Sequence, residues 1–348
     1  MRHIVILPPH SLWARWTNPP DPSEPDREKT FRLLAARGYR YRRLDPFGRP
    51  WNPFAKAHPI LRAIDPVRAL RVLLFHRRTD VVLCCFESSA LLILLLRRLF
   101  LFRGKVVVLD VGTGGNSRLR DLILRFVLPR ADMLLVLGHS QVAGLVAMGA
   151  RPNAIRLFRT GTDIDFFMDA GDQPDGYILA VGDDVSRDYS TLLKASVGLR
   201  RELIIRSRLV ANDEAELANI KVVSSNLPTR DYQRLIAGAV LVVLPLRPTI
   251  HAGGVTTLLE AMSSGKAVIV SASQGLADYI EDGKTCRVVS PSDPAALRKA
   301  LDDLLANALA RKRLGANARQ FVIENGSAES SAAQLAQLLG QLVGTASE

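Results

Sequence analysis

The stretch His251-Ala-Gly-Gly-Val-Thr-Thr-Leu-Leu-Glu260, followed by Ala-Met-Ser-Ser-Gly-Lys-Ala-Val-Ile-Val-Ser271, decides the fold of this 348-residue chain. It predicts a helix over 254–264 that opens at two glycines, and then a buried strand. The pair Gly253-Gly254 lets a ligand approach the backbone and leaves the first amide groups of the helix without partners. The positive end of the helix dipole lies at the same place, so this turn is suited to bind an anion.

A carboxylate lies further along the same helix. Glu260 is unsuited to hold phosphate, but its oxygens accept hydrogen bonds from hydroxyl groups. Thr256 lies four residues earlier on the same face, whereas Val255 faces the core. A helix with a binding site for phosphate and a hydrogen-bond acceptor for a diol indicates a sugar nucleotide as the ligand. The alternative is an ordinary amphipathic helix with a surface glutamate.

Short apolar runs alternate with amphipathic stretches along the chain. Buried strands are expected over 4–7, 80–86, 105–111, 131–137, 177–181, 203–205, 221–223, 241–244, 267–270 and 287–289. Alternating strands and helices with short loops predict parallel sheets covered by helices on both faces. The polar, glycine- and proline-marked segment 168–176 separates two such units. The predicted fold is α/β, with two Rossmann-like domains facing each other across a cleft.

Composition excludes several classes of protein. Aromatic residues make up 6% of the chain, so a base-stacking platform for nucleic acid is not expected. The three cysteines, Cys84, Cys85 and Cys286, lack the spacing of a disulfide framework or a zinc site, and we expect them to be reduced core residues in the cytoplasm. We expect neither a signal peptide nor a membrane-spanning helix, because the longest apolar block, 90–96, ends at Arg97-Arg98.

The positive charge is concentrated in the first half. Residues 1–168 hold 27 Lys and Arg against 13 Asp and Glu, a formal charge of +14, and the remainder holds 19 against 21, a charge of −2. Solvated arginines that serve solubility are one explanation, and a face that meets anionic lipid is another. The segment 89–103 is either a buried helix with snorkelling arginines or an interfacial helix on a membrane. Nucleic acid is not expected, since no known motif accompanies the charge.

Several segments resemble the carboxy-terminal half of GT-B glycosyltransferases, most closely the family-four group of retaining enzymes. They are residues 253–269, 275–283 and 289–294. Tyr177-Ile-Leu-Ala-Val-Gly182 with 187–193 resembles the strand that opens their second domain and its phosphate-side loop. Residues 160–167 resemble their Gly-x-Asp-x-x-x-Phe linker. The resemblance covers roughly residues 131–305.

The resemblance implies a glycosyltransferase that moves a sugar from a nucleoside diphosphate sugar, most often a UDP-sugar, to a saccharide or polyprenyl-linked acceptor. Glu260 matches the glutamate that binds the ribose hydroxyls, and Arg187 falls where the family places a lysine against the diphosphate. The other donor-binding positions form the diphosphate turn and the loop that frames the base: Gly253, Gly254, Val255 and Thr256, and Ser225, Asn226 and Leu227.

The chain departs from the family pattern at three places. Ala252 replaces the first glutamate of the Glu-x7-Glu signature, and Asp183 replaces the usual arginine. The turn 110–116 lacks the histidine that usually follows the fourth strand of the first domain. His251, next to Ala252, is a candidate for contact with the transferred sugar, with a loop histidine of no role as the alternative. Asp110 follows a first-domain strand and is a candidate catalytic or acceptor-binding residue, with a turn or capping aspartate as the alternative. Retention of configuration is expected rather than inversion.

No metal or cofactor is expected. Negative charge develops on the leaving diphosphate, and fixed cations and helix amides can neutralise it. Asp163-Ile-Asp165 spells the Asp-x-Asp of metal-dependent enzymes, but it lies in the linker between domains. Two other functions remain open: a sugar-nucleotide epimerase of the same fold, and a non-catalytic sugar-nucleotide-binding subunit, which the absence of a carboxylate at Ala252 would suit.

The domain plan follows from these assignments. Residues 1–168 are expected to form the acceptor-side domain and residues 169–325 the nucleotide-sugar-binding domain. Residues 326–348 are expected to form a helix that packs back on the N-terminal domain. We expect the protein in the cytoplasm, with peripheral attachment to the inner face of the cell membrane through an anionic surface as a further expectation.

Overall fold

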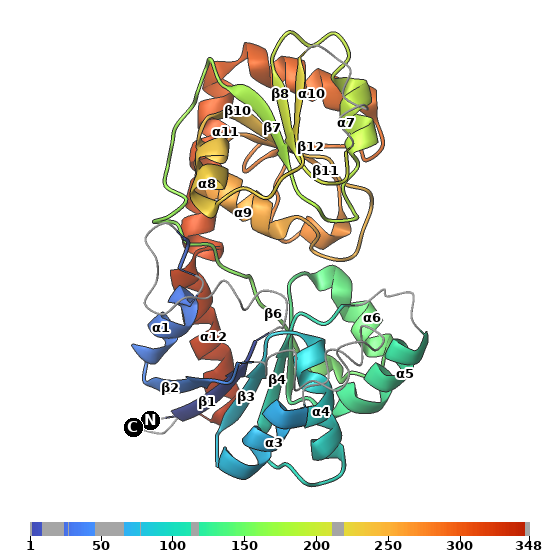
Figure 1. The fold of residues 1–348 in the computed structure, drawn as a ribbon, viewed down its shortest axis with the longest axis vertical. Helices are drawn as coiled ribbons and strands as arrows, with labels where there is room; N and C mark the ends of the chain where they lie inside the picture. Colours follow the sequence, from blue (N-terminus) through green and yellow to red (C-terminus); the bar gives the residue numbers. More distant parts are fainter. Residues whose placement is uncertain are drawn as a thin grey trace. The chain divides into compact units, whose positions relative to one another are not determined.

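The computed structural model describes residues 2–8, 24–26, 28–45, 66–76, 78–112, 118–210 and 219–344. The chain divides into two compact units (Figure 1). Unit 1 comprises Met1–Asn18, Glu28–Phe158 and Ala332–Glu348, and unit 2 comprises Pro19–Arg27 and Arg159–Ser331. Each unit is built on a parallel sheet with helices on both faces. The predicted α/β fold with two Rossmann-like units is therefore confirmed.

Unit 1 contains a parallel sheet made of β1 (Arg2–Leu7), β2 (Tyr39–Arg43), β3 (Val81–Cys84), β4 (Lys105–Leu109), β5 (Met133–Val136) and β6 (Ile155–Leu157). The strands lie in the order β2-β1-β3-β4-β5-β6. The two edge strands, β2 and β6, were not expected from the sequence. Both are short and only partly buried, so they lack the apolar runs that mark the inner strands.

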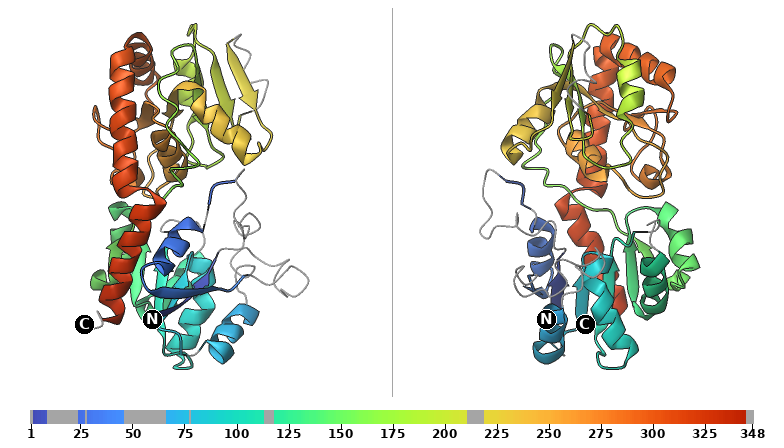
Figure 2. Two further views of the ribbon diagram at one scale, coloured as in Figure 1. Left: turned by 90° about the vertical axis from the view of Figure 1, so that its left-hand side faces the viewer. Right: turned by 45° about the vertical axis from the view of Figure 1, so that its right-hand side comes forward.

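Alternate residues of the inner strands of unit 1 enter two separate cores. Val82 and Val106 pack on one face with α4 (Glu87–Arg98) and α5 (Arg118–Val127). Val81 and Val107 pack on the other face, which α1 (Lys29–Ala35) and α12 (Ala328–Val343) cover. Figure 2 shows α12 running along this sheet, and Leu335, Leu338 and Leu339 bury its apolar side there. The other helices of the unit are α3 (Pro66–Phe75) and α6 (Val142–Ala147).

Unit 2 repeats this plan with β7 (Tyr177–Val181), β8 (Leu203–Arg206), β9 (Ile220–Val223), β10 (Ala239–Leu244), β11 (Val268–Ser271) and β12 (Arg287–Val289). The order is β12-β11-β10-β7-β8-β9. One face is covered by α9 (Val255–Ser263) and α11 (Ala308–Asn325), and the other by α7 (Tyr189–Ala195) and α10 (Pro294–Ala306). A further helix, α8 (Thr229–Ala237), leads into β10.

The division between the units differs from the boundary expected at residue 168. The chain enters unit 2 at Arg159, because the linker packs into the core of that unit. Phe166 and Phe167 are buried there, and the Ser263 hydroxyl donates to the Phe167 carbonyl at 2.7 Å. The C-terminal return to unit 1 starts at Ala332, within α12.

Lys266 closes the helix that begins at the double glycine. Its side chain is 1% exposed, and its ammonium donates to the carbonyls of Gly171 at 2.8 Å and Ala237 at 2.6 Å. Burial lowers the pKa of Lys266 to about 8, although Asp172 and Asp169 act in the opposite direction. This lysine joins the turn after α9 to the loop at Gly171 and to the C-terminus of α8.

The Lys266→Met variant tests this burial. The folded pKa lies below the ordinary value of 10.5, so the unfolded chain binds this proton more tightly and the group lowers stability below pH 8. The cost is relieved as the pH rises from about 8 to about 10.5. The free energy of unfolding of the wild type relative to the variant should rise by about 2–3 kcal/mol over that range, measured by urea denaturation. A difference that is constant with pH would contradict the assignment.

Candidate functional site

The candidate site lies where the strand order of unit 2 changes direction. β7 has β8 on one side and β10 on the other, so the loops that follow β7 and β10 diverge at the carboxyl edge of the sheet. Such switch points are where open α/β sheets bind ligands. The Arg247 amide donates to the Ser186 carbonyl at 2.8 Å, and the Asp188 amide donates to the Pro245 carbonyl at 2.9 Å. These bonds fix the two loops to each other.

The loop after β10 ends in the predicted double-glycine turn. Gly254 has φ +84°, a left-handed conformation that favours glycine, and α9 begins directly after it. The Val255 amide is used within the turn, where it donates to the Ala252 carbonyl at 3.1 Å. The amides of Thr256 and Thr257 donate to no acceptor in the described part of the chain. They and the helix dipole leave partial positive charge at this end of α9.

Arg187 lies against this turn. Its side chain is 3% exposed, and its Nη2 donates to the Thr257 hydroxyl at 3.3 Å. Within the described ranges, its Nε and Nη1 are buried without a hydrogen-bond partner and no carboxylate forms an ion pair with it. Burial lowers the pKa of Arg187, although Tyr189 and Asp184 favour its charge. A buried cation with free donors requires an anion that the protein itself does not supply.

Two glycines make room for the guanidinium. A Cβ atom at Gly182 would lie 2.4 Å from Arg187 Nε, and one at Gly254 would lie 3.0 Å from Nη1. Both glycines also have positive φ. A side chain at either position would therefore displace Arg187, which gives a physical reason for glycine after β7 and before α9.

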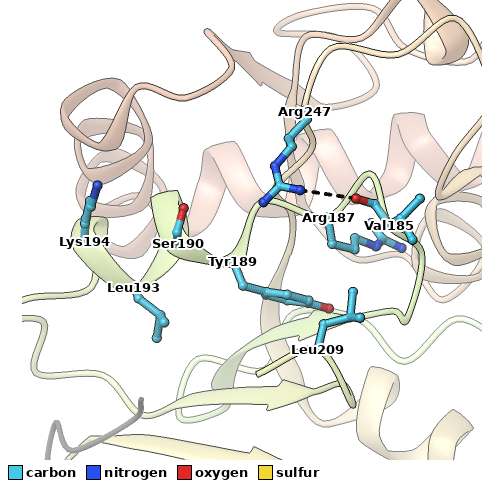
Figure 3. A pocket seen from close by; sticks show the side chains of 8 residues that line it. All are labelled: Val185, Arg187, Tyr189, Ser190, Leu193, Lys194, Leu209 and Arg247. Atoms are coloured by element: carbon cyan, nitrogen blue, oxygen red, sulfur yellow. Dashed lines mark hydrogen bonds between the residues drawn. The ribbon is translucent and has the colours of Figure 1, made fainter. Parts of the chain in front are cut away.

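A hollow of about 680 Å³ lies beside Arg187, on the side of α7 (Figure 3). Arg187, Lys194 and Arg247 supply three cations to its lining, and Val185, Leu193 and Leu209 supply apolar contacts. The Arg247 guanidinium donates to the Val185 carbonyl at 3.4 Å. The guanidinium of Arg187 thus lies between this hollow and the start of α9.

Glu260 is hydrogen-bonded to a tyrosine that the sequence did not single out. The Tyr232 hydroxyl, from α8, donates to Glu260 Oε2 at 2.7 Å. Burial and the Glu260 carboxylate raise the pKa of Tyr232 well above its ordinary value, so this hydroxyl stays protonated and donates. The Tyr232 ring packs edge-on against Phe167, 6.3 Å between centroids. Glu260 lies six residues after Gly254, about 9 Å along the helix.

Asp183 is neutralised by two arginines, one at the end of β8 and one in the loop that follows it. Its carboxylate pairs with Arg206 at 2.9 Å and Arg208 at 3.1 Å. Burial opposes its ionisation, but the Arg208 amide and both guanidiniums keep the pKa of Asp183 below its ordinary value. Arg206 also donates to Asn226 Oδ1 at 2.9 Å, which positions the loop after β9. The other two predicted residues of that loop, Ser225 and Leu227, are exposed and half-buried.

Two further predicted positions in unit 2 lie in loops. The His251 amide donates to the Thr249 hydroxyl at 3.1 Å, and the imidazole is half-buried. In the linker, Asp163 accepts from the amides of Asp26 at 2.9 Å and Asp165 at 3.3 Å, so its carboxylate has a local structural role. Thr256, by contrast, is exposed at the start of α9.

Asp110 belongs to unit 1 and directly follows β4. Its φ of +53° is left-handed, which is uncommon outside glycine and is often associated with functional sites. Buried Gln141 donates to Asp110 Oδ1 at 3.4 Å and accepts from the Leu137 amide at 2.9 Å, so it joins the loops after β4 and β5. The Glu87 carboxylate accepts from the Gly112 amide at 2.6 Å and Arg120 Nε at 2.8 Å. Residues 113–117, which come next in the chain, lie outside the described residues.

The described ranges offer neither a cluster of metal ligands nor a membrane-spanning helix. They contain no group of three or more His, Cys, Asp or Glu placed to hold a metal ion. None of their helices combines the length and the apolar character needed to span a bilayer. The three cysteines are buried and free.

Residues 209–321 match the family model described as "Glycosyl transferases group 1". The matched segment lies within unit 2. The double-glycine turn, Glu260 and the Tyr232 that binds it all lie within the matched segment, whereas Arg187 lies outside it. The resemblance predicted from the sequence is therefore confirmed at the level of the family.

Curated relatives of this chain include two Mycolicibacterium mannosyltransferases. The MMP α-(1→4)-mannosyltransferase of Mycolicibacterium hassiacum is 28% identical over 58% of this chain and 52% of its own length. The GDP-mannose-dependent α-(1-6)-phosphatidylinositol monomannoside mannosyltransferase of Mycolicibacterium smegmatis is 35% identical over 23% of this chain and 21% of its own length. The matches thus span about half or less of these relatives.

Solved structures share the whole architecture. Sucrose-phosphate synthase from Thermosynechococcus elongatus superimposes with a TM-score of 0.76 at 18% identity, covering 98% of this chain and 99% of the other. HepE from Anabaena, crystallised with UDP, gives a TM-score of 0.70 at 13% identity, covering 98% and 100%. At this identity the likeness establishes the fold, which is GT-B.

The Arg187→Met variant separates a ligand-binding cation from a structural one. Removing a buried charge that lacks a counter-ion should leave the melting temperature unchanged or raise it, while UDP affinity falls at least about tenfold. Affinity is measured by calorimetry and stability by thermal unfolding. The predicted donor-binding residues stay predictions until such measurements are made.

The matched control is Arg311→Met. Arg311 is 4% exposed, as buried as Arg187, but it forms two bonds to Asp172, at 2.9 and 3.0 Å. Its removal leaves the buried Asp172 carboxylate without its ion-pair partner and should lower the free energy of unfolding by about 3–5 kcal/mol. If Arg187→Met destabilised the protein as much as Arg311→Met does, the anion-binding role of Arg187 would be rejected.

Proposed function

We propose that this protein is a metal-independent glycosyltransferase that uses a nucleoside diphosphate sugar as donor. The observation that carries the proposal is the buried Arg187 guanidinium, which has two free donors and lies at the N-terminus of α9. A diphosphate bound there would complete the hydrogen bonds of Arg187 and of the Thr256 and Thr257 amides. The same groups would stabilise the negative charge that develops as the diphosphate leaves.

Glu260 is proposed to bind the ribose of the donor. Its Oε2 already accepts from Tyr232, and a carboxylate has further lone pairs that can accept from a diol. The loop after β9, held by the Arg206–Asn226 bond, is proposed to frame the base. His251, beside Ala252, is proposed to contact the transferred sugar, and Asp110 in unit 1 to contact the acceptor.

The names of the relatives guide the proposed donor and the proposed stereochemistry. UDP is our first choice of nucleotide, in keeping with the HepE complex, and GDP-mannose is the alternative donor that the Mycolicibacterium smegmatis relative suggests. Their α-linked products favour retention of configuration. We propose a saccharide acceptor, free or polyprenyl-linked, and action at the cytoplasmic face of a membrane.

The reaction type can be tested without knowing the acceptor. The purified chain is incubated with a panel of UDP- and GDP-sugars chosen by thermal shift, since tight ligands raise the melting temperature by mass action. We expect slow release of the nucleoside diphosphate and free sugar. A new sugar nucleotide would instead indicate an epimerase, and tight binding without turnover would indicate a non-catalytic subunit.

The Glu260→Ala variant tests the ribose contact. Each hydrogen bond to the carboxylate is worth roughly 1.5–3 kcal/mol, so nucleotide affinity should fall by one or more powers of ten. The melting temperature should fall as well, because the buried Tyr232 hydroxyl loses its acceptor. Tyr232→Phe is the matched control, because it removes the internal bond to Glu260 but keeps the carboxylate. Affinity for UDP by calorimetry should fall much less in Tyr232→Phe. Equal affinity in Glu260→Ala and the wild type would refute the assignment.

A further inference from the structure

Unit 1 exposes an apolar surface at one end of α4. Leu99, Phe100 and Leu101 follow α4 and are 57%, 76% and 53% exposed. Leu122 and Phe126 of α5 are 66% and 48% exposed, and their i, i+4 spacing puts them on one face of that helix. The two helices lie side by side in unit 1 (Figure 1), so these five residues form what we call the Phe100 patch.

Arginines join the two halves of the patch. The Arg98 guanidinium lies 4.1 Å from the centre of the Phe126 ring, and Arg130 lies 5.8 Å from the centre of the Phe100 ring. Arg103 and Arg125 are exposed at its margin. None of these four arginines forms an ion pair in the described part of the chain. The nearby carboxylate of Asp132 is already paired, with Arg97 and Lys105.

The backbone holds Phe100 outward at a conformational cost. Phe100 has φ +59°, a left-handed conformation that costs about 1–2 kcal/mol for a residue with a Cβ. The turn is fixed on both sides: the Phe100 amide donates to the Arg97 carbonyl at 3.1 Å, and Phe102 is 3% exposed in the core. Glycine would suit this position better for folding alone. The phenylalanine is therefore placed where its exposed ring has a use outside the fold.

We propose that the Phe100 patch docks unit 1 onto an anionic lipid surface. Large apolar side chains that can enter the acyl boundary, surrounded by arginines without counter-ions, are complementary to a membrane that carries negative headgroups. Scattered apolar side chains, surrounded by arginines that already form ion pairs with carboxylates, would lack this complementarity. The inference goes beyond the proposed donor chemistry, which involves unit 2 alone, and it locates membrane attachment at the end of the predicted segment 89–103.

The test uses the full chain and sedimentation with vesicles of phosphatidylcholine, with or without one third of phosphatidylglycerol. We expect co-sedimentation with the anionic vesicles, weakened by salt. Phe100→Gly should lower the partition coefficient at least about tenfold, since it removes the most exposed ring. The same variant should melt at an equal or higher temperature, because glycine relieves the left-handed strain. A loss of binding is then not a loss of folding.

Charge is tested separately. The double variant Arg103→Gln/Arg130→Gln should lower the partition coefficient by about 25-fold, or about fivefold for each arginine. Leu309→Ser and Arg313→Gln are the matched controls, because both side chains are exposed on α11 of unit 2 and neither belongs to the Phe100 patch. They should leave vesicle binding unchanged. UDP affinity, measured in parallel, should be the same in all these variants, so failure of the donor proposal would be seen independently.

Three results would overturn the inference. The first is equal binding to neutral and anionic vesicles without salt dependence. The second is unchanged vesicle binding in Phe100→Gly. The third is absence of vesicle binding together with a concentration-dependent dimer that Phe100→Gly dissociates, measured by light scattering, which would make the patch a contact between copies of this chain.

Discussion

A buried guanidinium without a counter-ion is the constraint around which unit 2 is arranged. Burying the charged Arg187 side chain away from water costs free energy, since neither its Nε nor its Nη1 finds a hydrogen-bond acceptor among the described residues. The surroundings nevertheless favour this placement: two positive-φ glycines leave space for it, and backbone bonds between the loops after β7 and β10 hold it there. An evolved protein can retain such an unfavourable burial when an anionic ligand supplies the missing charge. Ligand binding then offsets the free-energy cost of burying Arg187.

The parallel sheet explains why these groups meet. β7 and β10 are adjacent although residues 182–238 separate them in sequence, so the loop that carries Arg187 and the loop that ends at Gly254 share one edge. Helix α9 sets the distance between the two proposed ligand contacts, because its N-terminus and the Glu260 carboxylate are about 9 Å apart. Tyr232, from α8, holds that carboxylate at the second end. Rigid elements therefore set both ends of the site.

Much of this could be predicted from the sequence, because apolar runs such as Val106-Val107-Val108 and the Gly253-Gly254 turn are local signals. The edge strands β2 and β6 could not, since their partly polar residues resemble loops. The burial of Arg187 depends on where two distant loops pack, and the Tyr232–Glu260 bond joins residues of different helices. The Val255 amide, expected to be free, is used within its own turn. Contacts of this kind arise from tertiary packing and leave no periodic trace.

The path of the chain limits how the protein can be divided. Unit 1 takes its last helical segment, Ala332 onward, from beyond unit 2, and unit 2 takes Pro19–Arg27 from within unit 1. A fragment that stopped at Phe158 would leave Phe31, Tyr39 and the β-strand side chains of that core without Leu335, Leu338 and Leu339. Recombination with a related gene could therefore exchange the donor-side half only as an internal insert, with the terminal helix retained alongside the first half.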